Sequence, residues 1–394
     1  MRIVRLANYV GPRSGGMRTA LRELGAGYLA AGHEPVLVVP GRLRGRGDEQ
    51  TAQGRVITRY GPVVPFTGGY RALLARRGLA ALLTELRPDL IEVSDRTTLR
   101  WTGRWAREHG VPAVMVSHES LTGLLSLPAD VSGMSRWRSR LLANMGKALA
   151  DAFNRRSVRA YQRIVCTTRW AAAEFERIGA PNLTRIPLGV DLELFSPERY
   201  SCTTRDAYAG QEQTLLVHCG RLSVEKKPHR SLAAVAGLRA AGVDAVLVVA
   251  GDGPLRTRLE RAARRRSLPV RFAGFITDPK HLATLLASAD VVVAPGPVET
   301  FGLAALEALA CGTPVVVSAA SALPEVIGTA GVAVDGEDFA GGVRAVLARD
   351  PEARRGAART RAEEFGWPAS VAAFLAVHEA LNPDSSRSPG QVKP

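Results

Sequence analysis

Glu299 and Glu307 have the residue type and the spacing to hold part of a nucleotide. They lie in the stretch 294–318, APGPVETFGLAALEALACGTPVVVS, which follows one apolar strand and ends in another. A helix is expected to begin between them, so Glu307 would lie one to two turns along it, within reach of a ribose. The alternative is a loop carboxylate and a residue on a solvated helix face, because a short motif is only a hypothesis.

The start of this helix is a candidate site for a diphosphate. The residues there are Phe301, Gly302 and Leu303. Glycine lets a ligand approach the backbone closely, and the first amides of a helix have no intrahelical partner. The helix dipole adds partial positive charge at the same point. The sequence therefore predicts an anion site formed by backbone groups.

Arg221 and Lys226 are candidates for stabilising a leaving diphosphate. Arg221 follows the apolar run 214–220, which is expected to be a strand, and Lys226 lies in the loop beyond it. Such electrostatic groups each lower a reaction barrier by ~3–4 kcal/mol. Two isolated cations are more often surface charge. Glu299 ends a later strand of the same predicted sheet, however, and this favours a shared function.

His118 and Gly16 lie at strand ends in the first half of the chain. His118 follows the apolar run 112–117, and Gly16 lies in the glycine-rich turn GPRSGG after the first strand. Bare backbone at Gly16 can approach a phosphate or a sugar. The turn is not G-x-G-x-x-G and no acidic residue ends the second strand, which argues against an NAD site. A structural turn and a structural histidine are the alternative interpretations.

Further candidates lie at other strand ends. Gly251 belongs to the tight turn GDGP, in which Asp252 can simply cap a helix. Ile276 could pack on a nucleotide base, and Asp278 could accept hydrogen bonds from a guanine edge.

Glu92 and Asp95 end a further strand, where they could bind acceptor hydroxyls or position His118. His218 is expected in the core of a strand and His378 on a helix surface. The chain has no D-x-D motif, so no metal site is predicted.

Short apolar strands alternate with helical patterns in two successive series. The expected strands are 2–8, 35–40, 55–60, 89–94, 112–117 and 163–167, then 214–220, 245–251, 270–274, 290–295, 314–318 and 332–334. This alternation predicts an α/β protein with two Rossmann-like parallel-sheet domains across a cleft. An exposed loop is expected at 41–54 and an irregular linker at 185–213.

The predicted domains follow from these two series. The first is 1–198, the second is 199–367, a helix at 368–381 returns to the first, and 382–394 is a disordered tail. A chain of 394 residues with 46% hydrophobic content is ordinary for a globular protein of two domains. The N-terminus lacks the long apolar core of a signal peptide and the sequence has no apolar run of ~20 residues, so neither a signal peptide nor a membrane-spanning helix is expected. The four scattered cysteines predict neither disulfides nor a zinc site, so a cytoplasmic protein is expected.

The net charge of +15 requires either an acidic partner or a structural use of arginine. Candidate partners are nucleic acid, anionic lipid and a phosphorylated substrate. The chain has no nucleic-acid module and no aromatic and basic stacking motif, so no nucleic-acid partner is predicted. The alternative is that arginine serves as the solvated residue of Ala- and Arg-rich helices.

Taken in order, these motifs resemble family 4 glycosyltransferases, which are retaining enzymes with the GT-B fold. The matching stretches are GPRSGG, His118, IPLGVDLELFSP, GRLSVEK, AGDGPL, FAGFI and ETFGLAALEALACGTPVV, the last with the E-x7-E spacing. The resemblance covers residues 1 to about 381. It implies sugar transfer from a nucleotide donor, with retained configuration and without a metal ion or other cofactor.

By position, the resemblance implies a role for each candidate in the second half of the chain. Arg221 and Lys226 would neutralise the donor diphosphate, and Glu299 would contact the transferred sugar. Glu307 would bind the ribose hydroxyls, with the backbone of 301–303 nearby.

In the first half, Gly16 would lie against the diphosphate and His118 would touch the sugar or the acceptor. One departure is Lys227, where the family usually has glycine. A lysine there could crowd the turn, which puts its local geometry in question.

Within the family, the opening MRIVRLANYVGPRSGGMRTAL is most similar to actinobacterial mannosyltransferases that act on phosphatidylinositol mannosides. This similarity implies GDP-mannose as donor, an α-linkage, and an anionic glycolipid acceptor at the cytoplasmic face of the membrane. One alternative is a UDP-sugar-dependent enzyme that builds a soluble glycoside or polysaccharide. Another is a catalytically silent binder of nucleotide sugars or nucleic acid. The sequence does not indicate an oligomeric state.

Two basic segments, 70–83 and 137–161, can each form a helix with an apolar stripe. An apolar residue recurs at every fourth position of the second, at Trp137, Leu141, Met145, Leu149 and Phe153. A basic amphipathic helix is typical of a membrane interface, where each cation contributes ~1 kcal/mol. The alternative is that the stripe packs on its own domain, since amphipathic helices are common.

Overall fold

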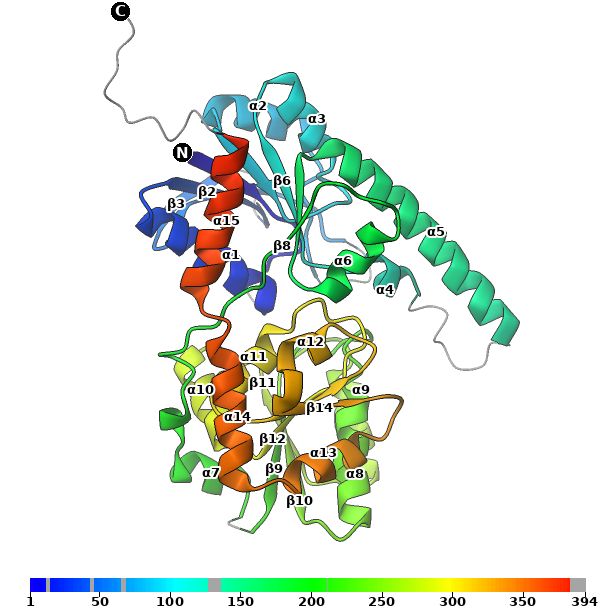
Figure 1. The fold of residues 1–394 in the computed structure, drawn as a ribbon. Coiled ribbons are helices and arrows are strands. Elements are labelled where there is room, and N and C mark those ends of the chain that lie inside the picture. The colour runs from blue at the N-terminus through cyan, green and yellow to red at the C-terminus, as the bar shows by residue number, and fades with distance from the viewer. Residues whose placement is uncertain (12–14, 43–45, 65–68, 127–135, 211, 383–394) are drawn as a thin grey trace, which may run out of the picture. The chain divides into compact units, whose positions relative to one another are not determined.

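The computed structural model describes residues 1–11, 15–42, 46–64, 69–126, 136–210 and 212–382. The chain divides into two compact units, each a β-sheet whose strands are connected largely by helices (Figure 1). The first unit comprises Met1–Pro187 and the chain from Trp367 onward, and the second comprises Leu188–Gly366. In the described part of the chain, no helix is long and apolar enough to cross a bilayer.

The described residues of the first unit form an eight-stranded sheet in the order β3-β4-β2-β1-β5-β6-β7-β8. The strands are β1 (Arg2–Leu6), β2 (Glu34–Gly41), β3 (Arg46–Thr51), β4 (Gly54–Tyr60), β5 (Leu90–Val93), β6 (Ala113–Ser117), β7 (Arg163–Cys166) and β8 (Leu183–Arg185). The helices are α1 (Gly16–Ala30), α2 (Arg76–Leu86), α3 (Trp101–Glu108), α4 (Leu121–Ser126), α5 (Arg136–Ala160), α6 (Arg169–Glu176) and α15 (Trp367–Leu381). The strand order reverses beside β1, and ligands of such sheets bind near that point at the carboxyl ends.

The second unit has a six-stranded parallel sheet in the order β11-β10-β9-β12-β13-β14, again counted over described residues. The strands are β9 (Thr214–Cys219), β10 (Ala245–Ala250), β11 (Val270–Gly274), β12 (Val291–Ala294), β13 (Val315–Ser318) and β14 (Gly331–Val334). The helices are α7 (Cys202–Tyr208), α8 (His229–Ala240), α9 (Arg256–Arg265), α10 (Pro279–Ser288), α11 (Leu303–Ala310), α12 (Leu323–Ile327), α13 (Phe339–Leu347) and α14 (Pro351–Glu363).

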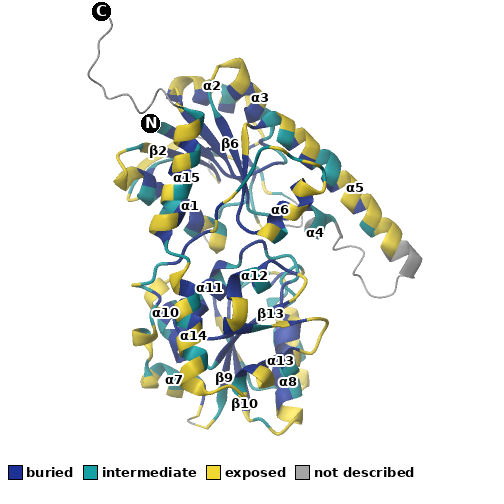
Figure 2. Ribbon diagram, viewed as in Figure 1, coloured by how far each residue is buried: buried dark blue, intermediate teal, exposed yellow. Residues whose placement is uncertain are grey.

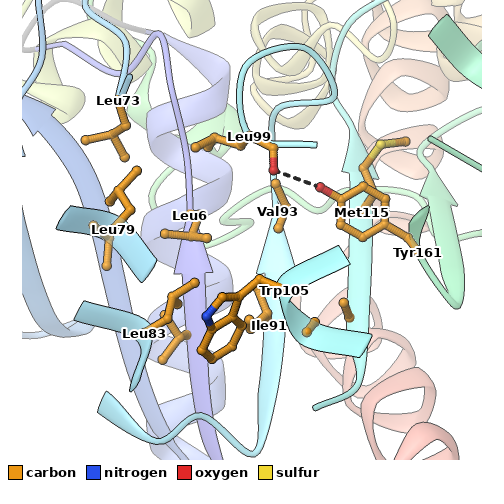
Figure 3. Packing of buried hydrophobic residues seen from close by; sticks show 14 of the residues in the cluster. Leu6, Leu73, Leu79, Leu83, Ile91, Val93, Leu99, Trp105, Met115 and Tyr161 are labelled. Carbon is orange, nitrogen blue, oxygen red and sulfur yellow. Dashed lines mark hydrogen bonds between the residues drawn. The ribbon is translucent and has the colours of Figure 1, made fainter. Parts of the chain in front are cut away.

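Continuous apolar runs make the central strands the core of each unit. Every residue of β6 and of β10 is buried, as expected for parallel strands covered on both faces. Figure 3 shows the cluster around the first sheet, where Trp105 and Tyr161 join aliphatic side chains. The Tyr161 hydroxyl donates to the Leu99 carbonyl at 3.3 Å, so its polar end is satisfied inside the core.

The segment 41–54, expected to be an exposed loop, contains a strand instead. β3 pairs antiparallel with β4 and extends the edge of the sheet. Gly54 makes the connection possible, because its φ is +97° and a Cβ there would overlap Pro35. The expectation of a loop was wrong because the charged residues of β3 lack the apolar alternation that marks a strand.

The division between the units falls after Pro187, earlier than the boundary expected at 198. The chain beyond it packs on the second unit, because Val190 pairs with Gly366 in a β-bridge and Arg359 donates to the Phe195 carbonyl. The chain returns to the first unit at Trp367, and α15 packs on α1 there. The predicted tail lies outside the described residues, except for residue 382.

Arginine side chains donate hydrogen bonds to backbone carbonyl groups in the second unit. Arg355 donates to the carbonyls of Ala287 and Ala289, and Arg361 donates to that of Val326. Such bonds satisfy carbonyl groups that helix ends leave without partners. Part of the arginine content therefore has a structural use.

Candidate active site

Backbone packing between two turns fixes the loop that carries Arg221 and Lys226. This loop follows β9, and through Leu222 it exchanges backbone hydrogen bonds with the turn after β10. A Cβ at Gly251 would overlap the carbonyl group of Gly220, so only glycine fits between the two turns. The structure thus gives Gly251 a packing role, and its contact with a donor stays a prediction.

Lys226 and Glu299 form an ion pair between the carboxyl ends of β9 and β12. Their side chains are 31% and 21% exposed. The two loops also touch through backbone, because a Cβ at Gly296 would lie 3.3 Å from the Lys226 Cα. Two residues that the sequence places at separate strand ends therefore meet at one point.

The turn before α11 has the geometry of a backbone anion site. Gly302 is the N-cap of α11 in the left-handed conformation, with φ +81°. The Phe301 ring is buried and packs edge-on against Phe365 at 6.0 Å between centroids. Contact with a ligand at Phe301 would therefore come from its backbone. Leu303 begins the helix, as the sequence indicates.

Replacing Gly302 by alanine is expected to lower the free energy of unfolding by about 2–3 kcal/mol. A left-handed φ costs a non-glycine residue ~1–2 kcal/mol, and the added Cβ would overlap the Leu323 side chain, which costs ~1 kcal/mol more. Denaturant unfolding measures the loss. Gly336→Ala is the matched control, because Gly336 has φ +89° but open space around an added Cβ. Equal losses in the two variants would contradict the overlap with Leu323.

Glu307 lies beside the strand end that carries the diphosphate candidates. Burial raises the pKa of the Cys219 thiol to about 12, and the Glu307 carboxylate adds to the rise. Cys219 is the last residue of β9, just before Gly220 and Arg221. The second unit therefore gathers Lys226, Glu299 and Glu307 around the carboxyl end of its central strand.

Asp278 and Ile276 lie in the loop after β11. Asp278 is the N-cap of α10, and its side chain accepts a hydrogen bond from the Lys280 amide at 3.0 Å. Ile276 is half-buried. The carboxylate proposed for a guanine edge thus has a capping role, and contact with a base stays a prediction.

The first unit contributes His118 and Gly16. His118 follows β6 and is half-buried, and burial lowers its pKa to about 4, with Glu92 opposing the shift and Arg5 adding to it. The imidazole is therefore neutral at pH 7 and can share a hydrogen bond rather than supply charge. Gly16 is exposed at the first position of α1.

Glu92 belongs to a buried network rather than to an acceptor site. Its side chain is 1% exposed, accepts from Arg5 at 3.0 Å and from the Tyr28 hydroxyl at 2.9 Å, and lies 3.5 Å from His378. The predictions that Glu92 binds acceptor hydroxyls and that His378 lies on a surface were wrong. Charged residues inside the apolar strands RIVRL and LIEV are the signal for this network, since buried charges require partners.

Arg96, which the sequence reasoning missed, holds the chain after His118. Its guanidinium is 5% exposed, pairs with Glu174 at 2.7 Å and donates to the Glu119 carbonyl. Asp95 accepts hydrogen bonds from the amides of its own turn, so it supports that turn rather than facing an acceptor. Arg96 thus helps to fix the loop after β6, and Asp95 fixes the turn after β5.

Arg230 was also missed, and it holds the chain that leads to Glu299. This guanidinium is buried, donates to the Pro295 carbonyl at 3.2 Å and pairs with Glu337. The ring of Phe339 lies 5.6 Å beneath it. The start of α8, HRSL, is polar, so no local pattern marks Arg230 as a buried residue.

Lys227 adopts the conformation that explains a glycine at this position in the family. Its φ is +43°, in the left-handed region that costs a non-glycine residue ~1–2 kcal/mol. The turn still forms, with the Lys227 amide bound to the Val224 carbonyl. Lys227 therefore strains the loop, and the turn forms with this strain.

Within the described ranges, no group of three or more His, Cys, Asp or Glu residues is placed to hold a metal ion.

Two family models match the chain and together cover most of both units. The model for glycosyl transferases group 1 matches residues 205–363, and the model for the glycosyl transferase 4-like domain matches 15–189. A GDP-mannose-dependent alpha-(1-6)-phosphatidylinositol dimannoside mannosyltransferase of Mycobacterium tuberculosis (strain ATCC 25177 / H37Ra) is 50% identical over 385 residues. That alignment covers 97% of each chain.

Solved structures share the fold at low sequence identity. Sucrose-phosphate synthase from Thermosynechococcus elongatus has a TM-score of 0.78 at 21% identity, covering 98% of this chain and 100% of that one. WaaG, a glycosyltransferase involved in lipopolysaccharide biosynthesis, has a TM-score of 0.67 at 18% identity, covering 97% and 99%. The fold class is GT-B, and the prediction of two Rossmann-like α/β units is confirmed. The chain belongs to the group 1 glycosyltransferases with a family 4-like first domain.

Proposed function

We propose that this glycosyltransferase moves mannose from GDP-mannose to a phosphatidylinositol mannoside, with an α-linkage, retained configuration and no metal ion. The observation that carries the proposal is the 50% identity over 97% of both chains to a mannosyltransferase of that donor and acceptor. Lys226, Glu299 and Glu307 at the end of β9 and the N-cap Gly302 support donor binding in the second unit.

The donor diphosphate is bound by Arg221, Lys226 and the amides at the start of α11. These groups neutralise the charge that develops when the nucleotide leaves, so they take the place of a metal ion. Glu299 orients the Lys226 ammonium through their ion pair and contacts the transferred mannose. Glu307 accepts hydrogen bonds from the ribose hydroxyls.

Transfer breaks the bond between the mannose anomeric carbon and the diphosphate oxygen and forms a bond to an acceptor hydroxyl oxygen. Attack takes place on the face that the leaving group occupies, which retains the configuration. The acceptor proton passes to a phosphate oxygen of the departing GDP. His118, neutral at pH 7, holds the sugar or the acceptor by a hydrogen bond, and Gly16 gives the diphosphate room.

The reaction is placed at the cytoplasmic surface of a membrane, where a glycolipid acceptor presents its headgroup. All four cysteines are free thiols, in keeping with a reducing compartment.

A thermal-shift screen with GDP, UDP and ADP sugars tests the donor. GDP-mannose is expected to raise Tm most, because a ligand that binds only the folded state stabilises it by RT ln(1 + [L]/Kd), about 2.7 kcal/mol at 100 times Kd. Stabilisation by UDP-glucose with none by GDP-mannose would overturn the donor assignment and favour a UDP-sugar-dependent enzyme.

A further inference from the structure

The net charge of the protein resides entirely in the first unit. The first unit contains 31 Lys and Arg against 16 Asp and Glu, whereas the second contains 21 of each, which together give the +15 of the whole chain. The donor has its cation site in the neutral second unit. The excess charge of the first unit therefore calls for another anionic partner.

Helix α5 concentrates this charge. Its 25 residues, RWRSRLLANMGKALADAFNRRSVRA, include seven Lys and Arg and a single acidic residue, Asp151. Asp151 is engaged in an ion pair with Arg177. Arg140, Lys147 and Arg155 are exposed.

The inner face of α5 is made of small and polar residues. Gly146, Ala150, Asn154 and Ser157 are buried. Gly146 lies so close to α4 that a Cβ there would come within 2.9 Å of the Leu125 carbonyl. The helix therefore packs on its unit mainly through small and polar residues, together with the half-buried Phe153 and Val158.

Three residues of the expected apolar stripe face outward, whereas Phe153 is half-buried and the Trp137 side chain lies outside the described part of the structure. Leu141, Met145 and Leu149 are 51%, 60% and 48% exposed, and the adjacent Leu142 is 38% exposed. Four-residue spacing places the first three along one side of the helix. The alternative, that this stripe packs on its own unit, is thereby excluded for these three residues. Figure 2 shows exposed residues along the part of α5 whose burial is described.

Toward its C-terminal end, α5 has a cation on the same side as the apolar stripe. Arg156 lies eleven residues beyond Met145, about three helical turns, so it follows the apolar stripe. Burial lowers the pKa of Arg100, and repulsion from Arg156 and Arg76 adds to the shift. Cations from α5, from the residue before α3 and from α2 thus lie near one another, as suits a surface that meets anionic groups.

We propose that α5 lies in the plane of an anionic membrane surface, with Leu141, Met145 and Leu149 inserted among the acyl chains. Arg140, Lys147 and Arg155 contact lipid phosphates beside the stripe. The apolar stripe suits the acyl chains of such a membrane, and the cations that border it suit the anionic headgroups. A second copy of the chain fits poorly as occupant, because it would bring the same cations against this helix. The proposal deepens the proposed function and rests on it for the glycolipid acceptor.

Co-sedimentation of the full-length protein with vesicles tests the proposal in the absence of donor. Vesicles of phosphatidylcholine with phosphatidylinositol should bind the protein, and pure phosphatidylcholine vesicles should bind it more weakly. The triple variant Leu141→Ser, Met145→Ser, Leu149→Ser should bind the anionic vesicles at least about tenfold less tightly. The double variant Lys147→Gln, Arg155→Gln should reduce the salt dependence of binding.

The matched control is the double variant Leu29→Ser, Tyr200→Ser. Both residues are exposed apolar residues outside α5, at 40% and 51%. This control should bind vesicles as the native protein does. Native vesicle binding by the triple variant would overturn the docking face, and so would a native dimer that the triple variant converts to a monomer. Transfer to detergent-solubilised glycolipid should be unchanged in the triple variant. If the native protein itself transferred no mannose to the solubilised glycolipid, that result would instead count against the proposed function.

Discussion

Replacing Arg221 by alanine is expected to lower kcat by about 100-fold or more while leaving the fold intact. Arg221 lies at the carboxyl end of β9, in the loop that two tight turns hold in place. The negative charge on the donor diphosphate grows as the sugar departs, so a cation here stabilises the transition state more than the ground state. The loss should therefore appear in kcat as well as in kcat/KM.

Steady-state turnover of GDP-mannose measures this effect. Arg221→Lys should recover part of the rate, because it keeps the charge but loses the planar fork of donors. Arg258→Ala, at an exposed position of α9, is the control for loss of a positive charge in the same unit. A native kcat for Arg221→Ala would remove the residue from the account of the reaction.

Replacing Glu307 by alanine is expected to weaken binding of GDP by about 10- to 100-fold. Hydrogen bonds from a ribose to a charged group contribute ~1.5–3 kcal/mol, and the variant loses this acceptor. The effect should reach GDP and GDP-mannose equally, because both contain the ribose. Turnover at saturating donor should change less than the affinity does, which distinguishes Glu307 from Arg221.

Isothermal titration calorimetry with GDP measures the change in Kd. Glu307→Gln keeps one acceptor oxygen and should lose less affinity. Glu352→Ala, at an exposed position in the first turn of α14, is the control for removal of a glutamate. An unchanged Kd in Glu307→Ala would exclude the ribose contact, even if the donor assignment held.

The sequence predicts the second sheet closely because most of its strands are continuous apolar runs. All six of its strands occur where these runs were found, and Glu299 and Arg221 lie at strand ends as expected. Parallel strands buried on both faces leave this pattern in the sequence. Ligands of parallel sheets bind at the carboxyl ends of the strands, so the site residues can be located without knowledge of their contacts.

Features that depend on contacts distant in the sequence were not predictable. Glu92 in β5 contacts Arg5, Tyr28 and His378, which come from three other elements, and no local pattern joins them. Strand β3 escaped notice because pairing with β4, rather than apolar periodicity, defines it.

The orientation of α5 was ambiguous for a related reason. A stripe of apolar residues shows which side of a helix is apolar but not what covers it. Only the structure shows that the small residues Gly146 and Ala150 face inward. The same limit applies to Arg96 and Arg230, whose partners lie on other elements.

Mass spectrometry of a glycolipid after incubation with the native protein and GDP-mannose tests the central claim most directly. The account predicts that phosphatidylinositol dimannoside gains one hexose, that the new linkage is α by NMR, and that Arg221→Ala nearly abolishes the product. A glycolipid left unchanged by GDP-mannose but extended from a UDP-sugar, or a β-linked product, would contradict it.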